Sequence, residues 1–227
     1  MNILVAGESL ELLAERAVFW EAKKSLLLSD IHIGKPESLQ AVGIPVPSGA
    51  HLDDLSRIDQ LLQRTHAEEV YILGDMIHNR HSWSDDIQND LKQFFTEHDH
   101  VHWTLLLGNH EKGSRQYLEK LPIDLIETDL VLGPFLLSHG HDSTVEDHQQ
   151  FIIQGHVHPV VRLNLGAIRL RLPCFVLNME RLTLPSFGML TGGYEISKSR
   201  GRRIFATTPE SVFEIPSNET LRTGAKK

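Results

Sequence analysis

The chain has 227 residues, of which 41% are hydrophobic and 23% are charged, an ordinary globular composition that argues against a disordered chain. There is no apolar run near the ~20 residues of a membrane helix and no secretory signal at the N-terminus, while a single cysteine, Cys174, excludes an internal disulfide and a cysteine-based zinc site. The formal net charge of −8 argues against nucleic-acid binding through bulk charge. We therefore expect a soluble, cytoplasmic protein with one domain over residues 1–215 and a mobile tail over 216–227.

The first half of the chain predicts alternating strands and helices. A helix is expected over 50–64, where apolar residues recur at helical spacing. A second is expected over 84–97, where Ser84 can cap the first turn. Short apolar runs that are typical of buried strands lie around these helices. They cover 25–28, 70–73, 103–107, 135–137 and 151–153.

The second half is richer in strands. The expected strands cover 160–165, 168–172, 175–177 and 182–184, with a turn at 164–166. A mixed first half joined to a strand-rich second half indicates an α/β fold with two sheets. We expect a layered α/β/β/α sandwich, or another two-sheet arrangement with helices outside.

A polar cluster follows each of five predicted strands. In an open α/β sheet, ligand-binding groups collect just beyond the carboxyl ends of the strands, so these clusters should converge in space. They contain several of the chain's 14 histidines, and histidine is the commonest metal ligand. The clusters are Ser29-Asp30-Ile31-His32, Gly74-Asp75-Met76-Ile77-His78, Gly108-Asn109-His110-Glu111, Ser138-His139-Gly140-His141 and Gln154-Gly155-His156-Val157-His158.

The donor atoms of these clusters predict a metal site. Carboxylates, an amide carbonyl and imidazoles suit Mn, Fe or Zn better than Ca. Asp30 and His32 are two residues apart, as are His156 and His158, and on an extended chain the side chains of such a pair point to one side. Any one of these pieces is common by chance and is equally well a surface pair. Five of them in order, each at a strand end, are not required by a hydrophobic core.

These motifs resemble the five-motif signature of the calcineurin-like metallophosphoesterases. The resemblance spans Asp30 to His158 and implies a four-layer α/β/β/α sandwich with two mixed sheets flanked by helices. One position departs from the family, which usually has Asp where this chain has Glu111. That residue is typically not a metal ligand, so the departure costs little. The motifs are Asp30-x-His32, Gly74-Asp75, Gly108-Asn109-His110-Glu111, His139 and Gly155-His156-x-His158.

The resemblance implies a role for each matching residue. Asp30, His32 and His158 would hold a first metal ion. Asn109, His139 and His156 would hold a second, and Asp75 would bridge the two. A metal-bridging hydroxide would be the nucleophile, and His110 would stabilise charge on the phosphate and deliver a proton to the leaving oxygen. Two divalent ions are expected, manganese first, with iron, zinc or nickel as alternatives.

Flanking segments resemble a narrower group, the ligase-associated DNA damage response subgroup called PdeM. That resemblance implies a DNA-repair endonuclease with a functional link to DNA ligase and helicase repair proteins, and no membrane partner. The residues themselves do not determine the oligomeric state. The segments are Asp30–Lys35, Gly43–Pro47, Gly155–Pro159, Leu170–Phe175 and Leu182–Gly188.

Several other polar residues have two readings. His78, His141 and Lys35 are expected to contact substrate, or else to lie on the surface or behind the ligands. The run 198–203 is densely basic, and Arg162, Arg169 and Arg171 can add to it. Such a patch can guide a polyanion locally, or it can be a solubilising loop. Cys174 lies in an apolar strand and is expected in the core.

Three functions remain open from the sequence. The first is a dinuclear-metal-dependent phosphodiesterase acting in DNA repair as a nuclease. The second is a phosphatase or small-nucleotide phosphodiesterase, which the absence of an added nucleic-acid module keeps open. The third is a scaffold of the same fold without catalysis. The complete set of ligands, with His110 present, argues against the third.

Overall fold

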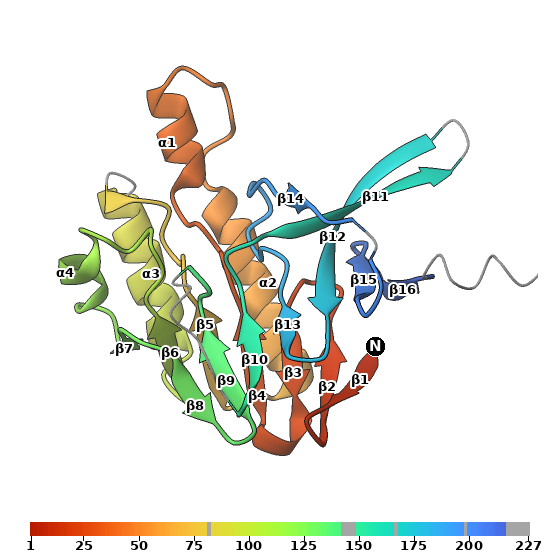
Figure 1. Cartoon of the computed structure of the whole chain (residues 1–227). Helices are drawn as coiled ribbons and strands as arrows, with labels where there is room; N and C mark the ends of the chain where they lie inside the picture. The colour runs from red at the N-terminus through yellow and green to blue at the C-terminus, as the bar shows by residue number, and fades with distance from the viewer. Residues whose placement is uncertain (81–82, 142–148, 166–167, 198, 217–227) are drawn as a thin grey trace, which may run out of the picture.

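Two β-sheets pack face to face in the computed structural model, and the long helices lie on the outer side of one sheet (Figure 1). The structure describes residues 1–80, 83–141, 149–165, 168–197 and 199–216. The predicted mobile tail therefore lies, from residue 217 onward, outside the described residues. Among the described helices, none is both long and apolar enough to cross a membrane.

The first sheet has seven strands in chain order. Strands β1 to β4 form an antiparallel meander, whereas β4, β5, β6 and β7 run parallel to one another. The carboxyl ends of the parallel strands therefore share one edge. The strands are β1 Asn2–Val5, β2 Glu8–Leu12, β3 Val18–Trp20, β4 Ser25–Leu28, β5 Glu69–Leu73, β6 His102–Leu106 and β7 Asp124–Ile126.

The second sheet has nine strands and contains the parallel pairs β9–β10 and β10–β13. Its long hairpin, β11–β12, continues beyond the body of the sheet (Figure 1). The strands are β8 Leu130–Leu132, β9 Phe135–Ser138, β10 Phe151–Gln154, β11 Pro159–Leu165, β12 Ile168–Leu177, β13 Arg181–Thr183, β14 Tyr194–Glu195, β15 Arg203–Thr207 and β16 Val212–Ile215.

Both predicted helices are present. Helix α2, Ala50–Thr65, buries Leu55, Ile58, Leu61 and Leu62 against the first sheet, as its apolar spacing predicts. In helix α3, Asp85–Glu97, the Ser84 hydroxyl accepts the Ile87 N–H at 3.2 Å, which confirms the predicted cap. Three short helices were not predicted. They are the 3₁₀ turn η1 Glu21–Lys23, α1 Lys35–Ala41 and α4 Arg115–Leu118.

Alternation along the strands divides the core into three layers. In β4, Leu26 and Leu28 face α2 and α3, whereas Leu27 faces the second sheet. In β12, Phe175 faces the first sheet and Cys174 faces outward into a third cluster. The predicted pair of mixed sheets with outer helices is confirmed. In the described residues the long helices cover the first sheet, and the third cluster, on the outer face of the second, is formed by strand residues and Ile196.

The strands differ from prediction in two ways: two expected strands are merged into one, and several strands were not expected. The strands expected over 168–172 and 175–177 form one strand, β12, whose first part pairs with β11 and whose second part pairs with β13 and β15. Strands β1 to β3, β7, β8 and β14 to β16 were not predicted. The predicted turn at 164–166 extends outside the described residues, because 166 and 167 are not among them.

Candidate metal centre

The five polar clusters lie together at one end of the two sheets. They follow β4, β5 and β6 of the first sheet and β9 and β10 of the second. Because β4, β5 and β6 are parallel, and β9 and β10 are parallel, each set of strands ends at one edge. Backbone pairing continues past the strands, with the Asp30 N–H donating to Gly74 at 3.1 Å and the His32 N–H donating to Asp75 at 2.9 Å.

The candidate ligands have unusual backbone conformations. Asp30, His32, Asp75, His156 and His158 all have φ between +48° and +68°, and they make up five of the nine described non-glycine residues with positive φ. The extended geometry expected for Asp30-x-His32 and His156-x-His158 was therefore wrong. Left-handed residues cost about 1–3 kcal/mol and cluster at functional sites, and Asp and His adopt this region more readily than most residues.

A first group of ligand-type atoms contains Asp30, His32, Asp75 and His158, with one donor atom from each lying within 4.8 Å of the others. His32 Nε2 is 3.4 Å from His158 Nε2 and 3.8 Å from Asp75 Oδ2. Two ligands held about 2.0–2.2 Å from one ion lie about 3–3.5 Å apart. The separation of the two imidazole nitrogens therefore fits a shared cation.

One carboxylate oxygen of Asp30 is hydrogen-bonded to the protein, and the other has no hydrogen-bond partner. Its Oδ2 accepts the Ser29 hydroxyl at 2.5 Å and the His156 N–H at 2.9 Å. Its Oδ1 is buried without a hydrogen-bond partner, and His158 Nε2, at 2.8 Å, is not in hydrogen-bond geometry. A buried carboxylate oxygen left unpaired is costly unless a cation binds it, so Asp30 fits the predicted metal ligand.

A second group contains Asp75, His139 and His156, and Asn109 lies beside it. His139 Nε2 is 3.2 Å from His156 Nδ1, 3.2 Å from Asn109 Oδ1 and 3.4 Å from Asp75 Oδ2. His139 Nδ1 donates to the Leu73 carbonyl at 2.8 Å. That bond fixes the orientation of the ring, so Nε2 is the nitrogen that would bind a metal ion once its proton is displaced.

Asp75 belongs to both groups, and its charge dominates the site. Burial opposes its ionisation, but His139 and the other groups around the carboxylate outweigh burial and hold the pKa of Asp75 well below its usual range. Burial also opposes a charge on His139, but the hydrogen bond and charge of Asp75 outweigh it and raise the pKa of His139 to about 9. Burial lowers the pKa of His32 to about 3, so His32 offers a neutral nitrogen. An anionic carboxylate among imidazoles suits divalent transition metals.

His110 lies beside both groups without belonging to either. Its Nδ1 is hydrogen-bonded to the His78 carbonyl, which can only accept, so Nδ1 carries the proton and Nε2 is free. Nε2 lies 3.8 Å from Asp75 Oδ2. The His110 ring stacks on the His78 ring at 5.2 Å and meets the His32 ring edge-on at 4.8 Å. These three histidines also form a third group of potential ligands.

The remaining predicted residues surround the cluster. The His78 ring is 5.5 Å from that of His32, and burial, helped by the charge of Lys35, lowers the pKa of His78 to about 4. Lys35 itself is half-buried at the start of α1, and burial lowers its pKa. The His141 ring is exposed and lies 5.2 Å from the His139 ring. The structure thus brings every predicted site residue to one region.

The sequence interpretation missed what Glu111 does. This buried carboxylate accepts the N–H groups of Gly108 at 2.8 Å and of Asp75 and Ile77 at 3.1 Å. Burial and the nearby charge of Asp75 raise the pKa of Glu111 to about 7. The position of Glu111 directly after Asn109 and His110 could have indicated this role. A carboxylate that lies in a metal-binding motif but is not itself a ligand is available to accept hydrogen bonds from the loop that carries the ligands.

A second missed element is the loop after β13, residues 184–188. The Ser186 hydroxyl donates to the Asp30 carbonyl at 2.7 Å, and the N–H groups of Phe187 and Gly188 donate to Ser29 and Asp30 at 2.8 and 3.2 Å. Behind it, Arg57 of α2 donates to the Phe187 carbonyl at 2.9 Å. The loop thus fixes the backbone that carries Asp30. The only sequence signal was the resemblance of 182–188 to the narrower subgroup.

Gly155 is required by close packing at the same point. A Cβ at Gly155 would lie 1.7 Å from the Ser29 hydroxyl and 2.6 Å from Asp30 Oδ2. Any larger residue would displace the hydrogen bond that orients Asp30.

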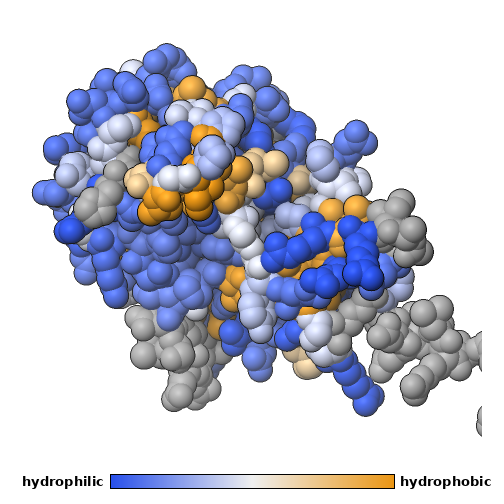
Figure 2. Space-filling model, turned by 90° about the horizontal axis from the view of Figure 1, so that it is seen from above, coloured by the Kyte–Doolittle hydropathy of each residue, from blue (hydrophilic) through white to orange (hydrophobic). Residues whose placement is uncertain are grey.

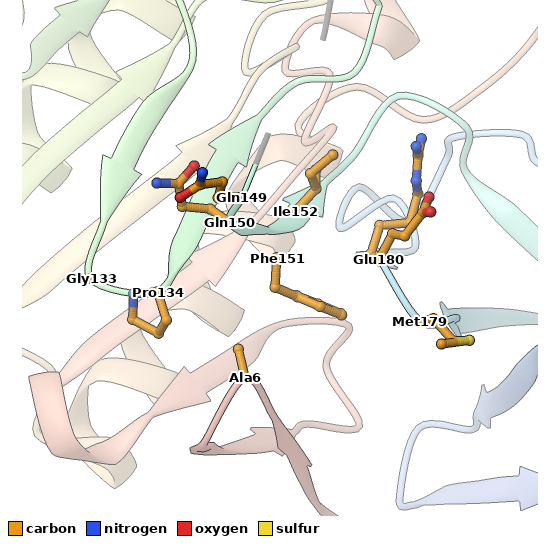
Figure 3. A pocket seen from close by; sticks show the side chains of 10 residues that line it. Ala6, Gly133, Pro134, Gln149, Gln150, Phe151, Ile152, Met179 and Glu180 are labelled. Carbon is orange, nitrogen blue, oxygen red and sulfur yellow. The ribbon is translucent and has the colours of Figure 1, made fainter. Parts of the chain in front are cut away.

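A separate open pocket lies at the other end of the sheets (Figure 3). Its volume is about 810 Å³, and it is lined by the turn before β9, the start of β10 and the turn before β13, with Phe151 and Met179 among its side chains. None of the predicted site residues lines it. This cavity is therefore distinct from the candidate metal centre.

Comparisons with known proteins agree with this geometry. A family model for calcineurin-like phosphoesterases matches residues 23–169, a range that contains all the candidate ligands. The crystal structure of the nuclease MPE from Pseudomonas putida matches with a TM-score of 0.81 and 32% identity, covering 95% of this chain and 99% of that one. No curated protein matches in sequence.

Two other solved structures are more distant. The phosphoesterase Yfce from E. coli matches with a TM-score of 0.45 and 19% identity, covering 86% of this chain and 99% of that one. The protein of unknown function AQ665 from Aquifex aeolicus has a TM-score of 0.40 and 19% identity, covering 59% of this chain and 78% of that one.

Proposed function

Because this chain belongs to the calcineurin-like phosphoesterase family, we propose that its clustered side chains bind two divalent metal ions and hydrolyse phosphodiester bonds, with DNA as the substrate. The observation that carries the proposal is the position of Asp75. It is the one residue shared by the group that contains Asp30, His32 and His158 and by the group that contains His139 and His156. A single carboxylate between two sets of ligands is the arrangement that a two-metal site needs.

The proposed ligands divide along these groups. Asp30, His32 and His158 would hold the first ion, with Asp30 Oδ1 and the imidazole nitrogens as donors, and Asp75 would be shared by the two ions. His139 and His156 would hold the second ion, with Asn109 contributing its amide oxygen. When bound, two divalent ions neutralise phosphate charge and lower the pKa of water, so that a strong nucleophile is available near neutral pH. Manganese is the ion we propose, since the donor set mixes oxygen and nitrogen without sulfur.

His110 is proposed as the proton donor to the leaving oxygen. Its Nδ1 proton is committed to the His78 carbonyl, so only Nε2 can exchange a proton with substrate. The His110 side chain is about one-third exposed, and its Nε2 lies close to the carboxylate of Asp75. A protonated Nε2 would stabilise negative charge on the phosphate before it transfers the proton.

The choice of a diester substrate is supported by the similarity to the MPE nuclease over nearly the whole chain. A phosphatase or a small-nucleotide phosphodiesterase would use the same ligands. Binding of DNA, a link to ligase and helicase repair proteins, and a cytoplasmic location are further proposals that follow the resemblance of the sequence to repair nucleases.

The test compares a generic aryl phosphodiester with its monoester, using chelator-stripped protein to which Mn, Fe, Zn, Ni or Mg is returned. We expect diester cleavage restored by Mn. Asp75→Asn should bind fewer than two ions and lose activity by about 100-fold or more, because the shared charge is gone. Asp124→Asn is the matched control, since Asp124 pairs with His102 on the exposed surface at the start of β7.

Two outcomes would contradict the proposal. Preference for the monoester would make the protein a phosphatase. Full metal binding without cleavage of either substrate, whichever metal is supplied, would leave a non-catalytic scaffold of the same fold.

A further inference from the structure

The β11–β12 hairpin is joined directly to the candidate metal centre. β11 begins at Pro159, the residue after His158, and runs antiparallel to β12 over residues 160–165. In Figure 1 the hairpin projects from the body of the protein. Its first residues share the carboxyl-terminal end of β10, where the ligands lie. The arm is therefore a continuation of the site rather than a remote appendage.

One face of this arm carries three arginines. Arg162 lies directly opposite Arg171, and Asn164 lies opposite Arg169. Because side chains alternate along a strand and opposed residues share a face, all three guanidinium groups lie on one side. On the other side, Leu163 and Leu172 pack against the third core cluster. The arm is thus amphipathic, and its arginine face is exposed.

The three arginines contribute little to the stability of the fold. Like charges directly opposite one another on a sheet destabilise it. Arg162 is balanced in part by Glu195 at 2.8 Å, but both side chains are about half exposed, and such a pair contributes little. Arg171 donates to the Gly193 carbonyl. Three arginines on one exposed face, in a chain whose formal net charge is −8, point to an anionic partner.

The position of the face indicates which anion. Figure 2, which looks down on the end of the molecule where the arm lies, shows strongly hydrophilic side chains on the projecting arm. At about 3.3 Å per residue, Arg162 lies ~13 Å along β11 from His158. Arg169 lies opposite Asn164, which is ~20 Å along the same strand from His158. A polynucleotide strand, with phosphates repeated along its length, can lie at the metal centre and reach all three arginines at once.

We propose that the face formed by Arg162, Arg169 and Arg171 binds the sugar-phosphate backbone of a polynucleotide whose scissile bond lies at the metal centre. The inference rests on the proposed phosphodiesterase function. Guanidinium groups match phosphate oxygens bidentately, and phosphate contacts fix the register of a nucleic acid without reading its sequence. An acidic protein segment would satisfy the charges too. It would not explain why the arginines continue from the ligands of a phosphodiester-cleaving site.

The test uses the triple variant Arg162→Gln, Arg169→Gln, Arg171→Gln in the metal-loaded protein. On a single-stranded DNA oligonucleotide we expect KM to rise at least about tenfold, with kcat within about twofold. The dependence of log KM on log salt should weaken by about 2, since each lost contact to a single strand contributes ~0.7. Cleavage of the aryl diester, which is too small to reach the arm, should be unchanged.

The matched control removes three cations from the far end of the molecule. Lys23, Lys24 and Arg64 are exposed near the start of β4 and the end of α2, where Lys24 and Arg64 are ion-paired with Glu68 and Glu15, and replacement of all three by Gln should leave oligonucleotide cleavage unchanged. An equal rise in KM in the control would mean that net charge alone is responsible. An equal loss on the aryl diester would mean that the arm substitutions damage the site.

Failure of the inference and failure of the proposed function give different results. The proposed function fails if the wild-type protein cleaves neither substrate. The arm is tested separately by fluorescence anisotropy with a labelled oligonucleotide, in a metal-loaded His110→Ala background. The inference is overturned if the arm variant binds that oligonucleotide as tightly as the parent.

Discussion

Single side chains in this site are oriented by the groups behind them. His139 and His110 each use Nδ1 to donate to a backbone carbonyl, so the orientation of each ring is fixed and Nε2 faces the cluster. Asp30 is held in the same way through Oδ2, which accepts two hydrogen bonds while Oδ1 stays available. In each residue, the polar atom that is hydrogen-bonded to the protein therefore determines which other atom faces the cluster.

His110 offers a sharp test at this scale. We expect His110→Ala to lower kcat on the aryl diester by about 100- to 1000-fold, because proton transfer by a positioned side chain is worth about that much. Metal content should stay at two ions per chain, since His110 belongs to neither group that contains Asp75. His102→Ala, which removes an exposed histidine paired with Asp124, is the control. Loss of one metal ion in His110→Ala would instead make His110 a ligand.

At the scale of elements, loops from distant parts of the chain hold the ligand loop after β4. The loop after β5 pairs with it through Gly74, Asp75 and Met76. The loop at 184–188 closes over its other side, and α2 supports that loop through Arg57, whose guanidinium also lies 4.1 Å from the centre of the Phe187 ring. Asp30 therefore depends on three separate segments for its position.

Gly188 provides the test for this support. A Cβ there would lie 2.0 Å from the Ile31 carbonyl, so Gly188→Ala must push the loop away from Asp30. We expect affinity for one of the two metal ions to fall by about 10- to 100-fold, the usual cost of disturbing groups behind a ligand. Isothermal titration calorimetry with Mn measures this.

Gly192→Ala is the control for that substitution, because a Cβ at Gly192 meets nothing within 4 Å. Equal affinity in the two variants would show that the loop does not position Asp30.

At the scale of the whole molecule, the candidate centre joins the two sheets. Asp30, His32 and Asp75 come from loops of the first sheet, whereas His139, His156 and His158 come from loops of the second. Between the sheets, apolar side chains such as Leu27, Tyr71, Phe135 and Phe175 form one continuous layer. The relative position of the sheets, and therefore the site, depends on the packing of this layer.

Cys174 links the free energy of unfolding of the protein to pH. Burial raises the pKa of its thiol to about 12, above its ordinary value of 9.0. The unfolded chain loses the thiol proton near pH 9, whereas the folded chain keeps it, so the free energy of unfolding falls as the pH rises from 9 towards 12. We expect this contribution to reach about 2 kcal/mol at pH 10.5.

Urea unfolding at pH 8 and pH 10.5 measures that effect, and Cys174→Ala removes the contribution of the thiol while other groups still titrate. The difference in pH dependence between the two proteins should therefore be about 2 kcal/mol. Rapid labelling of Cys174 by a thiol reagent at pH 8 without denaturant would show that the third cluster opens locally, and would contradict the expectation.

The sequence by itself determined the strands that carry the site and the residue types that follow them. Apolar runs as short as 25–28 and 70–73 were sufficient, because a strand buried on both faces forms a nearly continuous hydrophobic run. Only the tertiary structure decided the left-handed conformation of Asp30 and His32 and the support from Arg57 and Glu111. These features depend on contacts between segments as far as 156 residues apart, as between Ser186 and Asp30. Local patterns cannot specify such contacts, because they arise only when both sheets are packed.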